Sequence, residues 1–185
     1  MIEAALAAVL KGQVVGLPTD TVYGIGADPF NEEAVARLFE LKGRPPEKPI
    51  GVLVATVEQA AEIGEIHDAA AELVSRHWPG ALTLVVIPKV VMADWVGDQQ
   101  LGTLGIRVPA HPVARRLLTV SGPLAVTSAN ESGGPETMSD REAREVFGDR
   151  VALYLEGTAP GGEASTVVDA TQARLTVLRT GPIEI

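Results

Sequence analysis

The segment from residue 14 to residue 54 places polar loops on both sides of one predicted helix, which is a common layout for a binding site. The first loop gathers hydroxyls and a carboxylate over residues 19–23. Gly24 and Gly26 follow, and they predict tight turns in the same loop. The second loop, residues 42–48, is cationic and rich in proline. Together these loops could hold a small polar ligand that carries negative charge.

Four basic residues are the candidates to neutralise phosphate groups. Lys42, Arg44, Arg107 and Arg179 each stand in a loop or at the end of a predicted strand. The sequence has no P-loop, because none of its lysines is followed by Ser or Thr, and no GxGxxG follows a predicted strand. A bound nucleotide would therefore be held by side-chain cations and hydroxyls.

Arg107 and the pair Ser128 and Asn130 are placed where an open α/β sheet binds ligands. Arg107 lies inside an apolar strand, so we expect it either to pair with a carboxylate or to face a cleft. Ser128 and Asn130 come directly after another predicted strand. Each signal also has a plainer explanation. Basic residues such as those of Lys42-Gly43-Arg44 complement the dipole at a helix end, and Thr, Asp, Ser and Asn form turns.

The composition excludes several classes of protein. The 185 residues include no cysteine and three histidines in no ligand spacing, so neither a disulfide nor a structural metal is expected. The net charge of −9 argues against broad affinity for nucleic acid. Residues 99–130 contain no acid, however, and neither do residues 41–46. An acidic shell with local basic patches suits a pocket for a small anion.

The sequence predicts a cytoplasmic protein without a membrane span. Residues 1–10 contain Glu3 and no basic residue, unlike a signal peptide. No apolar run approaches the roughly 20 residues that a membrane-spanning helix needs.

Periodicity and capping residues predict interleaved helices and strands, hence a single α/β domain over residues 1–185 with a twisted mixed β-sheet flanked by helices. Asn31, Thr56, Asp68 and Ser139 are the expected starts of helices. His111 is expected to cap a further helix. The predicted helices are 2–10, 32–42, 57–63, 69–77, 112–120 and 140–147. The predicted strands are 14–17, 50–54, 81–87 (buried on both faces), 104–108, 124–127, 151–155, 165–169 and 175–179.

Seven separated motifs, covering nearly the whole chain, resemble those of the YrdC/Sua5 family. In order they are PTDTVYGIGAD, LKGRPPEKPI, PGALTLVV, GIRVPAHP, TSANESGG, STVVD and VLRTGP. Members of this family are threonylcarbamoyl-AMP synthases, and the chain length is similar to that of the short, single-domain form.

The resemblance implies a concave ligand-binding surface on the sheet and a nucleotidyltransferase reaction. ATP, L-threonine and bicarbonate would give L-threonylcarbamoyladenylate and pyrophosphate, the first step towards N6-threonylcarbamoyladenosine at position 37 of tRNA. Mg²⁺ would accompany ATP, and no protein metal site is expected. A downstream threonylcarbamoyl transferase complex would consume the product.

The resemblance also implies roles for individual residues. The lysine-x-arginine signature falls on Lys42 and Arg44, the catalytic candidates, and Lys42 would lie along the phosphates. The residues expected to contact ATP are Lys42, Arg44, Lys48, Thr103, Ser128, Asn130 and Arg179. The residues expected to hold threonine are Thr21, Arg107, Ser128 and Ser165, with Arg107 pairing the threonine carboxylate.

An alternative function stays open. The family includes a paralogous branch without clear synthase activity and members described as binders of double-stranded RNA. The alternative is therefore a double-stranded RNA- or tRNA-binding or ribosome-maturation module, and weak RNA binding is also compatible with the synthase. The glycine-rich loop 157–163 is the candidate for a mobile lid over the site.

Overall fold

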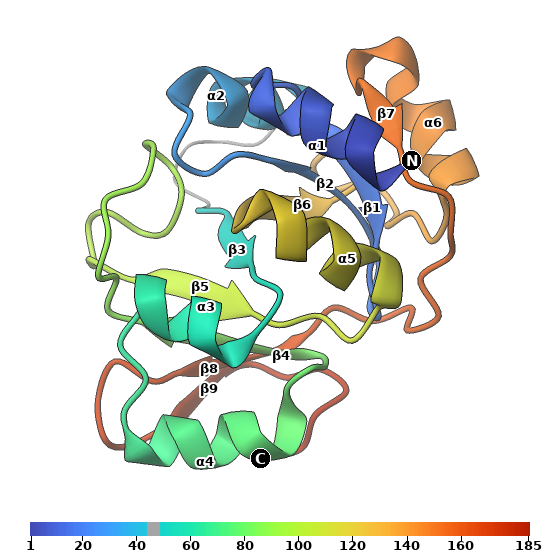
Figure 1. Cartoon of the computed structure of the whole chain (residues 1–185). Helices are drawn as coiled ribbons and strands as arrows, with labels where there is room; N and C mark the ends of the chain where they lie inside the picture. The colour runs from blue at the N-terminus through green and yellow to red at the C-terminus, as the bar shows by residue number, and fades with distance from the viewer. Residues whose placement is uncertain (44–48) are drawn as a thin grey trace.

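A nine-stranded sheet forms the centre of the computed structural model, which describes residues 1–43 and 49–185 (Figure 1). The helices are α1 (Ile2–Leu10), α2 (Glu32–Lys42), α3 (Val57–Ile63), α4 (Asp68–His77), α5 (Pro112–Ser121), α6 (Asp140–Phe147) and the 3-10 turn η1 (Gly148–Arg150). The strands are β1 (Val15–Pro18), β2 (Tyr23–Ala27), β3 (Gly51–Leu53), β4 (Leu82–Val86), β5 (Leu104–Arg107), β6 (Leu124–Ser128), β7 (Leu153–Tyr154), β8 (Thr166–Asp169) and β9 (Thr176–Arg179).

The sheet is mixed, as the sequence predicts. Its strand order is β7-β1-β2-β6-β3-β5-β4-β8-β9. Three of the neighbouring pairs, β1–β7, β3–β5 and β4–β8, are parallel, and the others are antiparallel. Strand β7 is one edge and β8 lies beside the other edge, so the connection between them crosses the whole sheet. Figure 1 shows this segment descending along one side of the molecule.

The predicted capping residues begin most of the helices. Asn31 Oδ1 accepts from the Ala34 N–H at 3.1 Å, and Ser139 Oγ accepts from the Glu142 N–H at 3.2 Å. The prediction for α4 was wrong by one residue. His67, not Asp68, is its cap, with Nδ1 accepting from a backbone N–H. Asp68 instead occupies the first turn, where its charge complements the helix dipole.

Residues 23–27 form strand β2, and the expectation of a polar loop there was wrong. The strand is buried between β1 and β6. Gly24 and Gly26 lie against Val126, whose methyl groups would be 2.9 and 2.8 Å from an added Cβ. These glycines therefore serve close packing between strands rather than tight turns.

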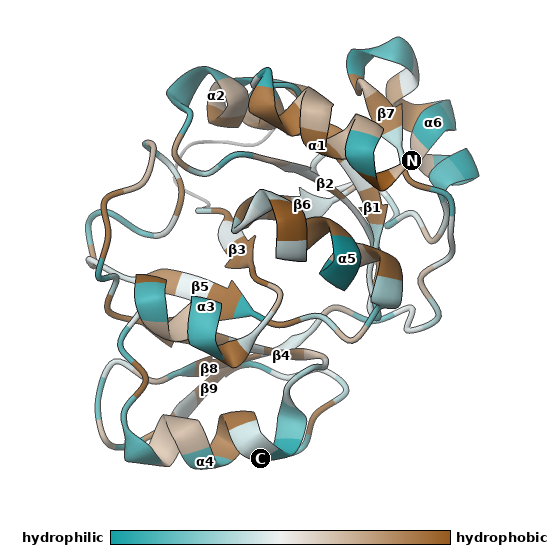
Figure 2. Cartoon of the chain, in the orientation of Figure 1, coloured by the Kyte–Doolittle hydropathy of each residue, from teal (hydrophilic) through white to brown (hydrophobic). Residues whose placement is uncertain are grey.

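The two faces of the sheet are covered unequally. One face packs against α2, α3 and α4 through a large aliphatic core that includes Ile25, Val52, Leu84 and Ile106. The opposite face is covered only in part, because α1 and α5 pack there on Leu17, Leu53 and Leu124. Helices α3 and α5 show both hydrophilic and hydrophobic surface (Figure 2), as expected for helices lying on a sheet. The uncovered part of this face leaves a broad sheet surface accessible to a ligand.

Strand β4 shows this one-sided burial directly. Leu82, Leu84 and Val86 are fully buried, whereas Thr83 and Val85 are half-buried and line a cavity. The prediction that this strand is buried on both faces was therefore wrong. The sequence of β4 is apolar at nearly every position, like that of a strand buried on both faces, because the apolar Val85 lines the cavity.

No helix in the described parts of the chain has the length and apolar character that crossing a membrane would require.

Candidate functional site

A cavity of about 540 Å³ occupies the uncovered part of the sheet. Strands β3, β5 and β4 form its floor, and the loop after β1 and the ends of β6, β8 and β9 form its walls. Six of the residues predicted from the sequence line it: Thr21, Thr103, Arg107, Ser128, Ser165 and Arg179. Arg44 and Lys48 lie outside the described residues. Residues from position 21 to position 179 thus meet at one place.

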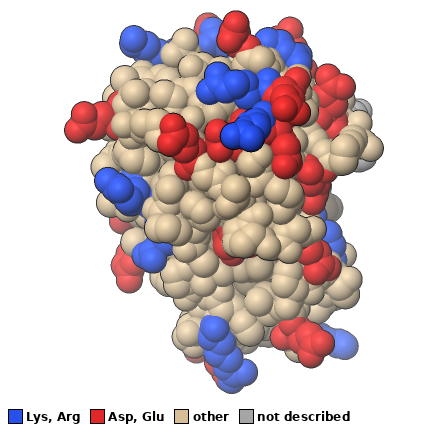
Figure 3. Space-filling view, turned by 90° about the vertical axis from the view of Figure 1, so that its right-hand side faces the viewer, with Lys and Arg blue, Asp and Glu red and all other residues tan. Residues whose placement is uncertain are grey.

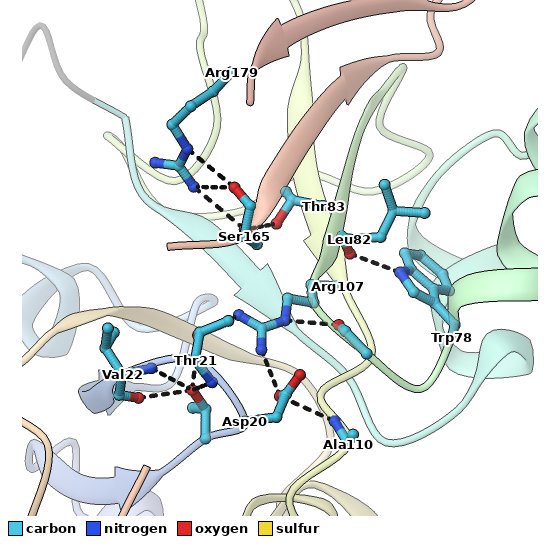
Figure 4. Close-up of polar contacts among 12 residues, drawn as sticks. Asp20, Thr21, Val22, Trp78, Leu82, Thr83, Arg107, Ala110, Ser165 and Arg179 are labelled. Carbon is cyan, nitrogen blue, oxygen red and sulfur yellow. Dashed lines mark hydrogen bonds and ion pairs between the residues drawn. The ribbon is translucent and has the colours of Figure 1, made fainter. Parts of the chain in front are cut away.

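Arg107 faces the cavity and is also paired with a carboxylate, so both alternatives for this residue hold. Its Nη2 forms an ion pair with Asp20 Oδ1, its Nη1 donates to Thr21 Oγ1 at 2.8 Å, and its Nε donates to Gly80 O at 3.0 Å (Figure 4). The side chains of Arg107 and Asp20 are 8% and 16% exposed. Two separate segments, residues 20–21 and Gly80, therefore fix the guanidinium in one orientation, and two of its N–H groups remain for a ligand.

The environment of Arg107 favours recognition of an anion. Burial lowers the pKa of its guanidinium, Asp20 opposes that shift, and Arg179 adds to it. Arginine stays protonated despite such shifts. The result is a desolvated cation at the cavity wall, where a bidentate contact to a carboxylate would be strong.

Asp20 pairs with the arginine of the cavity wall, whereas the sequence indicated only a polar turn at this position. Its Oδ1 accepts from Arg107 and from the Ala110 N–H at 3.0 Å. Asp20 does not line the cavity, so it positions Arg107 from behind. The only signal in the sequence was the need of a buried arginine for a partner.

A second group of polar side chains lies on the opposite wall. Arg179 Nη2 donates to Ser165 O at 2.8 Å and to Ser165 Oγ at 3.2 Å, and its Nε donates to the same carbonyl. Ser165 Oγ is 2.7 Å from Thr83 Oγ1 (Figure 4). Thr83 was missed because it stands inside an apolar strand, although its place in the alternation with Leu82 and Leu84 marks the cavity face.

Lys42 forms the third group, at the end of α2. Its Nζ donates to Asn130 Oδ1 at 2.5 Å, to Ser128 Oγ at 3.0 Å and to Ser128 O at 2.8 Å. Lys42 and Asn130 are 4% and 6% exposed. Neither lines the cavity directly, and Ser128 connects them to its wall. The structure thus brings together the lysine, serine and asparagine that the motifs single out.

Thr103 and Tyr23 have different positions. Thr103 lines the cavity at the start of β5, where its backbone N–H and C=O pair with Asp98 at 2.9 and 2.7 Å. Tyr23 points away from the site, because its ring is buried and its hydroxyl donates to Leu155 O at 2.7 Å. The expectation that Tyr23 contributes a hydroxyl to the binding loop was therefore wrong.

The groups around Arg107 and Arg179 line one cavity, and the group around Lys42 adjoins it through Ser128. The cavity can hold an extended anionic ligand or two ligands side by side. In the ranges 1–43 and 49–185 no three His, Asp or Glu side chains lie together as a metal site would require. Lys and Arg side chains supply the positive charge around the cavity, which suits an anionic ligand.

Comparison with known proteins places the chain. A putative threonylcarbamoyl-AMP synthase of Mycobacterium tuberculosis is 46% identical over 186 residues, which cover 98% of this chain and 84% of that protein. The structure of Pyrococcus abyssi Sua5 complexed with L-threonine superposes with a TM-score of 0.91 at 38% identity. That match covers 97% of this chain, which spans about half (54%) of the archaeal chain.

A second structure, Escherichia coli YciO, superposes with a TM-score of 0.89 at 25% identity and covers 99% of this chain and 90% of its own. The family model named Sua5/YciO/YrdC, with the description "Telomere recombination", matches residues 7–181. The mixed α/β fold agrees with these structures. The chain belongs to the Sua5/YciO/YrdC family.

Proposed function

We propose that this protein is an L-threonylcarbamoyladenylate synthase. The reaction converts L-threonine, bicarbonate and ATP into L-threonylcarbamoyladenylate, pyrophosphate and water, and it serves the formation of N6-threonylcarbamoyladenosine in tRNA. The observation that carries the proposal is the pairing of Arg107 with Thr21 and Asp20 on one wall of the cavity, opposite Arg179 and Ser165. Relatives with this synthase name are 34–46% identical over nearly the full chain.

In this proposal the threonine carboxylate pairs with Arg107 beside Thr21. Arg107 keeps two N–H groups for this contact, and its orientation is already fixed, so little rotamer entropy is lost on binding. Ser165 and Ser128 contribute hydroxyls to the same substrate. Discrimination against serine then depends on an apolar recess for the methyl group, which typically contributes ~1–3 kcal/mol.

ATP would lie along the rest of the cavity. Arg179 and Thr103 are the proposed contacts on its wall, and Lys42 and Asn130 reach the phosphates through the Ser128 side. Arg44 and Lys48 are proposed to add charge from the segment between α2 and β3. Mg²⁺ would arrive bound to the phosphates, held by them and by water rather than by a protein cage.

The chemistry needs positioning more than covalent catalysis. The threonine amine and bicarbonate form a carbamate with loss of water. The carbamate oxygen then forms a bond to the α-phosphorus while the bond to pyrophosphate breaks. Because no covalent enzyme intermediate is required, the absence of cysteine from the sequence is no obstacle. The protein brings the reactants together and stabilises charge on the phosphates with Lys42 and Arg44, the proposed catalytic residues.

The test is a turnover assay with purified protein, ATP, radiolabelled bicarbonate and a panel of amino acids. We expect pyrophosphate and an acid-labile adenylate only when both threonine and bicarbonate are present. Pyrophosphate release without dependence on threonine would contradict the proposal. The adenylate is a reactive mixed anhydride, so we further propose that a threonylcarbamoyl transferase complex in the cytoplasm consumes it.

Binding of double-stranded RNA is the other function to test. Against it stand the net charge of −9 and the mixing of acidic and basic side chains on the face shown in Figure 3. RNA binding that falls steeply with salt, in a protein that releases no pyrophosphate, would favour this alternative.

A further inference from the structure

Gly105 lies at the centre of the cavity floor. Register places Val126 beside Gly51 and Val85 beside Gly105, and an added Cβ on Gly105 would lie 3.8 Å from the Gly51 Cα. The order across the sheet is therefore Val126, Gly51, Gly105, Val85, and all four line the cavity. The floor is thus a strip of bare backbone between two valines.

Glycine inside a strand weakens it, so each such glycine needs a reason. For four of the five glycines in the described strands the protein supplies one. An added Cβ would come within 3.1 Å of a neighbouring protein atom at positions 16, 24, 26 and 51. At Gly105 the nearest atom is Thr83 Cγ2 at 3.5 Å, an ordinary contact, and the backbone φ is not positive. Alanine would fit there without strain from the protein.

We propose that residue 105 is glycine because the reacting groups of the substrates occupy the space of its side chain. This inference rests on the proposed synthase function and names a positioning residue for it. Thr103, which directly precedes β5, and Gly105 and Arg107 of β5 all line the cavity, and successive members of this series are ~7 Å apart along the chain. Arg107 is the proposed anchor of threonine and Thr103 a proposed contact of ATP. Gly105 lies between them, where the carbamate oxygen meets the α-phosphorus.

A methyl group at this point would lift one reactant away from the other. The bond from the carbamate oxygen to phosphorus forms in line with the leaving pyrophosphate, so the step depends on alignment over the floor. A displacement of about 1 Å can cost about 10²-fold in rate. Arg107 would still hold the threonine carboxylate, so the loss should appear in kcat and in the affinity for ATP more than in the KM for threonine.

The experiment compares wild-type protein with Gly105→Ala. We expect an equal or higher Tm, because alanine suits a strand better than glycine, together with a kcat about 10²-fold lower. An unchanged kcat would overturn the proposal. A lower Tm with a changed circular-dichroism spectrum would also overturn it, because Gly105 would then be needed by the fold.

A second variant distinguishes a clash of the added methyl group with the substrates from a clash with the protein itself. Gly105→Ala with Thr83→Ser removes Cγ2, the nearest protein atom, and keeps the hydroxyl that meets Ser165. Recovery of kcat in this double variant would assign the loss to packing and overturn the proposal, whereas no recovery supports it.

A binding measurement tests whether a ligand occupies the space above Gly105, even if the synthase proposal fails. Calorimetric titration of ATP into each protein, with threonine present and bicarbonate removed, requires no turnover. Weaker binding by Gly105→Ala supports a ligand over the floor, and equal binding overturns it. Failure of the wild-type protein to release pyrophosphate would instead count against the proposed function alone.

Discussion

The Nη1 of Arg107 donates a hydrogen bond to Thr21 Oγ1 over 2.8 Å, which joins the end of β5 to the loop between β1 and β2. Thr21 Oγ1 lies 3.0 Å from Thr19 Oγ1, and Thr19 Oγ1 in turn donates to Val22 O at 2.7 Å. The loop and the arginine therefore hold one another in place. A change on either side should affect the binding of threonine.

Replacement of the arginine tests this directly. Arg107→Ala should abolish threonine-dependent pyrophosphate release and lower the free energy of unfolding by about 3 kcal/mol, because the half-buried Asp20 carboxylate loses its cationic partner and keeps only the Ala110 N–H. Denaturant unfolding and the turnover assay measure the two effects. Arg116→Ala, an exposed arginine on α5, is the matched control. Restored activity in the Arg107→Ala, Asp20→Ala double variant would refute a role of Arg107 in binding.

Lys42 should matter for the chemical step. Lys42→Met keeps an unbranched side chain but removes the charge that Ser128 and Asn130 orient. We expect kcat to fall about 10²-fold or more, since charge stabilisation at phosphates is lost. Lys11→Met, at the exposed end of α1, is the control. Wild-type turnover by Lys42→Met would show that this lysine only supports the fold.

The connection between β7 and β8 should control the threonine loop. Gly162 N–H donates to Thr21 O at 2.9 Å, and an added Cβ on Gly161 would lie 2.4 Å from Asp20 O. Gly161→Ala should therefore push this connection off the loop, raise the KM for threonine and destabilise the fold by about 1–3 kcal/mol.

Limited proteolysis provides an independent measurement on the same segment, which the sequence suggests as a lid. Cleavage within residues 157–163 should be slower with ATP and threonine present, and Gly161→Ala should be cleaved faster than Glu163→Ala, the exposed control. Equal cleavage with and without ligands would contradict a lid.

His111 should make stability depend on pH. Its Nδ1 accepts from the Val113 N–H at 3.3 Å, and burial lowers its pKa while Asp20 opposes the shift. The unfolded chain, with a histidine pKa of about 6.5, therefore binds the proton more tightly than the folded protein. The stabilisation is complete above pH ~6.5 and is lost as the pH falls through the lower, folded-state pKa.

The measurement is Tm against pH for the wild-type protein and His111→Asn. Asparagine is a strong N-cap that does not titrate, so its Tm should fall less on acidification. Parallel curves for the two proteins would show that His111 does not carry the pH dependence.

The sequence predicted which segments form helices and strands better than it predicted which segments lie side by side in the fold. Caps such as Asn31 and Ser139 act locally, so they identified helix starts within one residue. Strand β2 was missed because the close contact of Gly24 with Val126 joins segments about a hundred residues apart. The strand order depends on such contacts throughout and could not be predicted.

The residues of the candidate site were likewise predicted only in part. Arg107 and Ser128 were predicted from residue type and from motifs, since a buried cation and a polar strand end are visible in the sequence. Asp20, Thr83 and Gly105 were not assigned roles, because their importance arises from what lies opposite them in the folded sheet.

The β7–β8 connection also determines at which stage of folding the cavity is complete. Ser165 and Arg179 reach the cavity only after the chain has crossed the sheet and β8 and β9 have paired beside β4. Such distant pairings form slowly. A chain still emerging from the ribosome would therefore have Arg107 and no opposite wall, and could not begin to activate threonine. The ability to bind ligand should therefore appear in one step late in folding, and the gain of ligand binding would report that folding is complete.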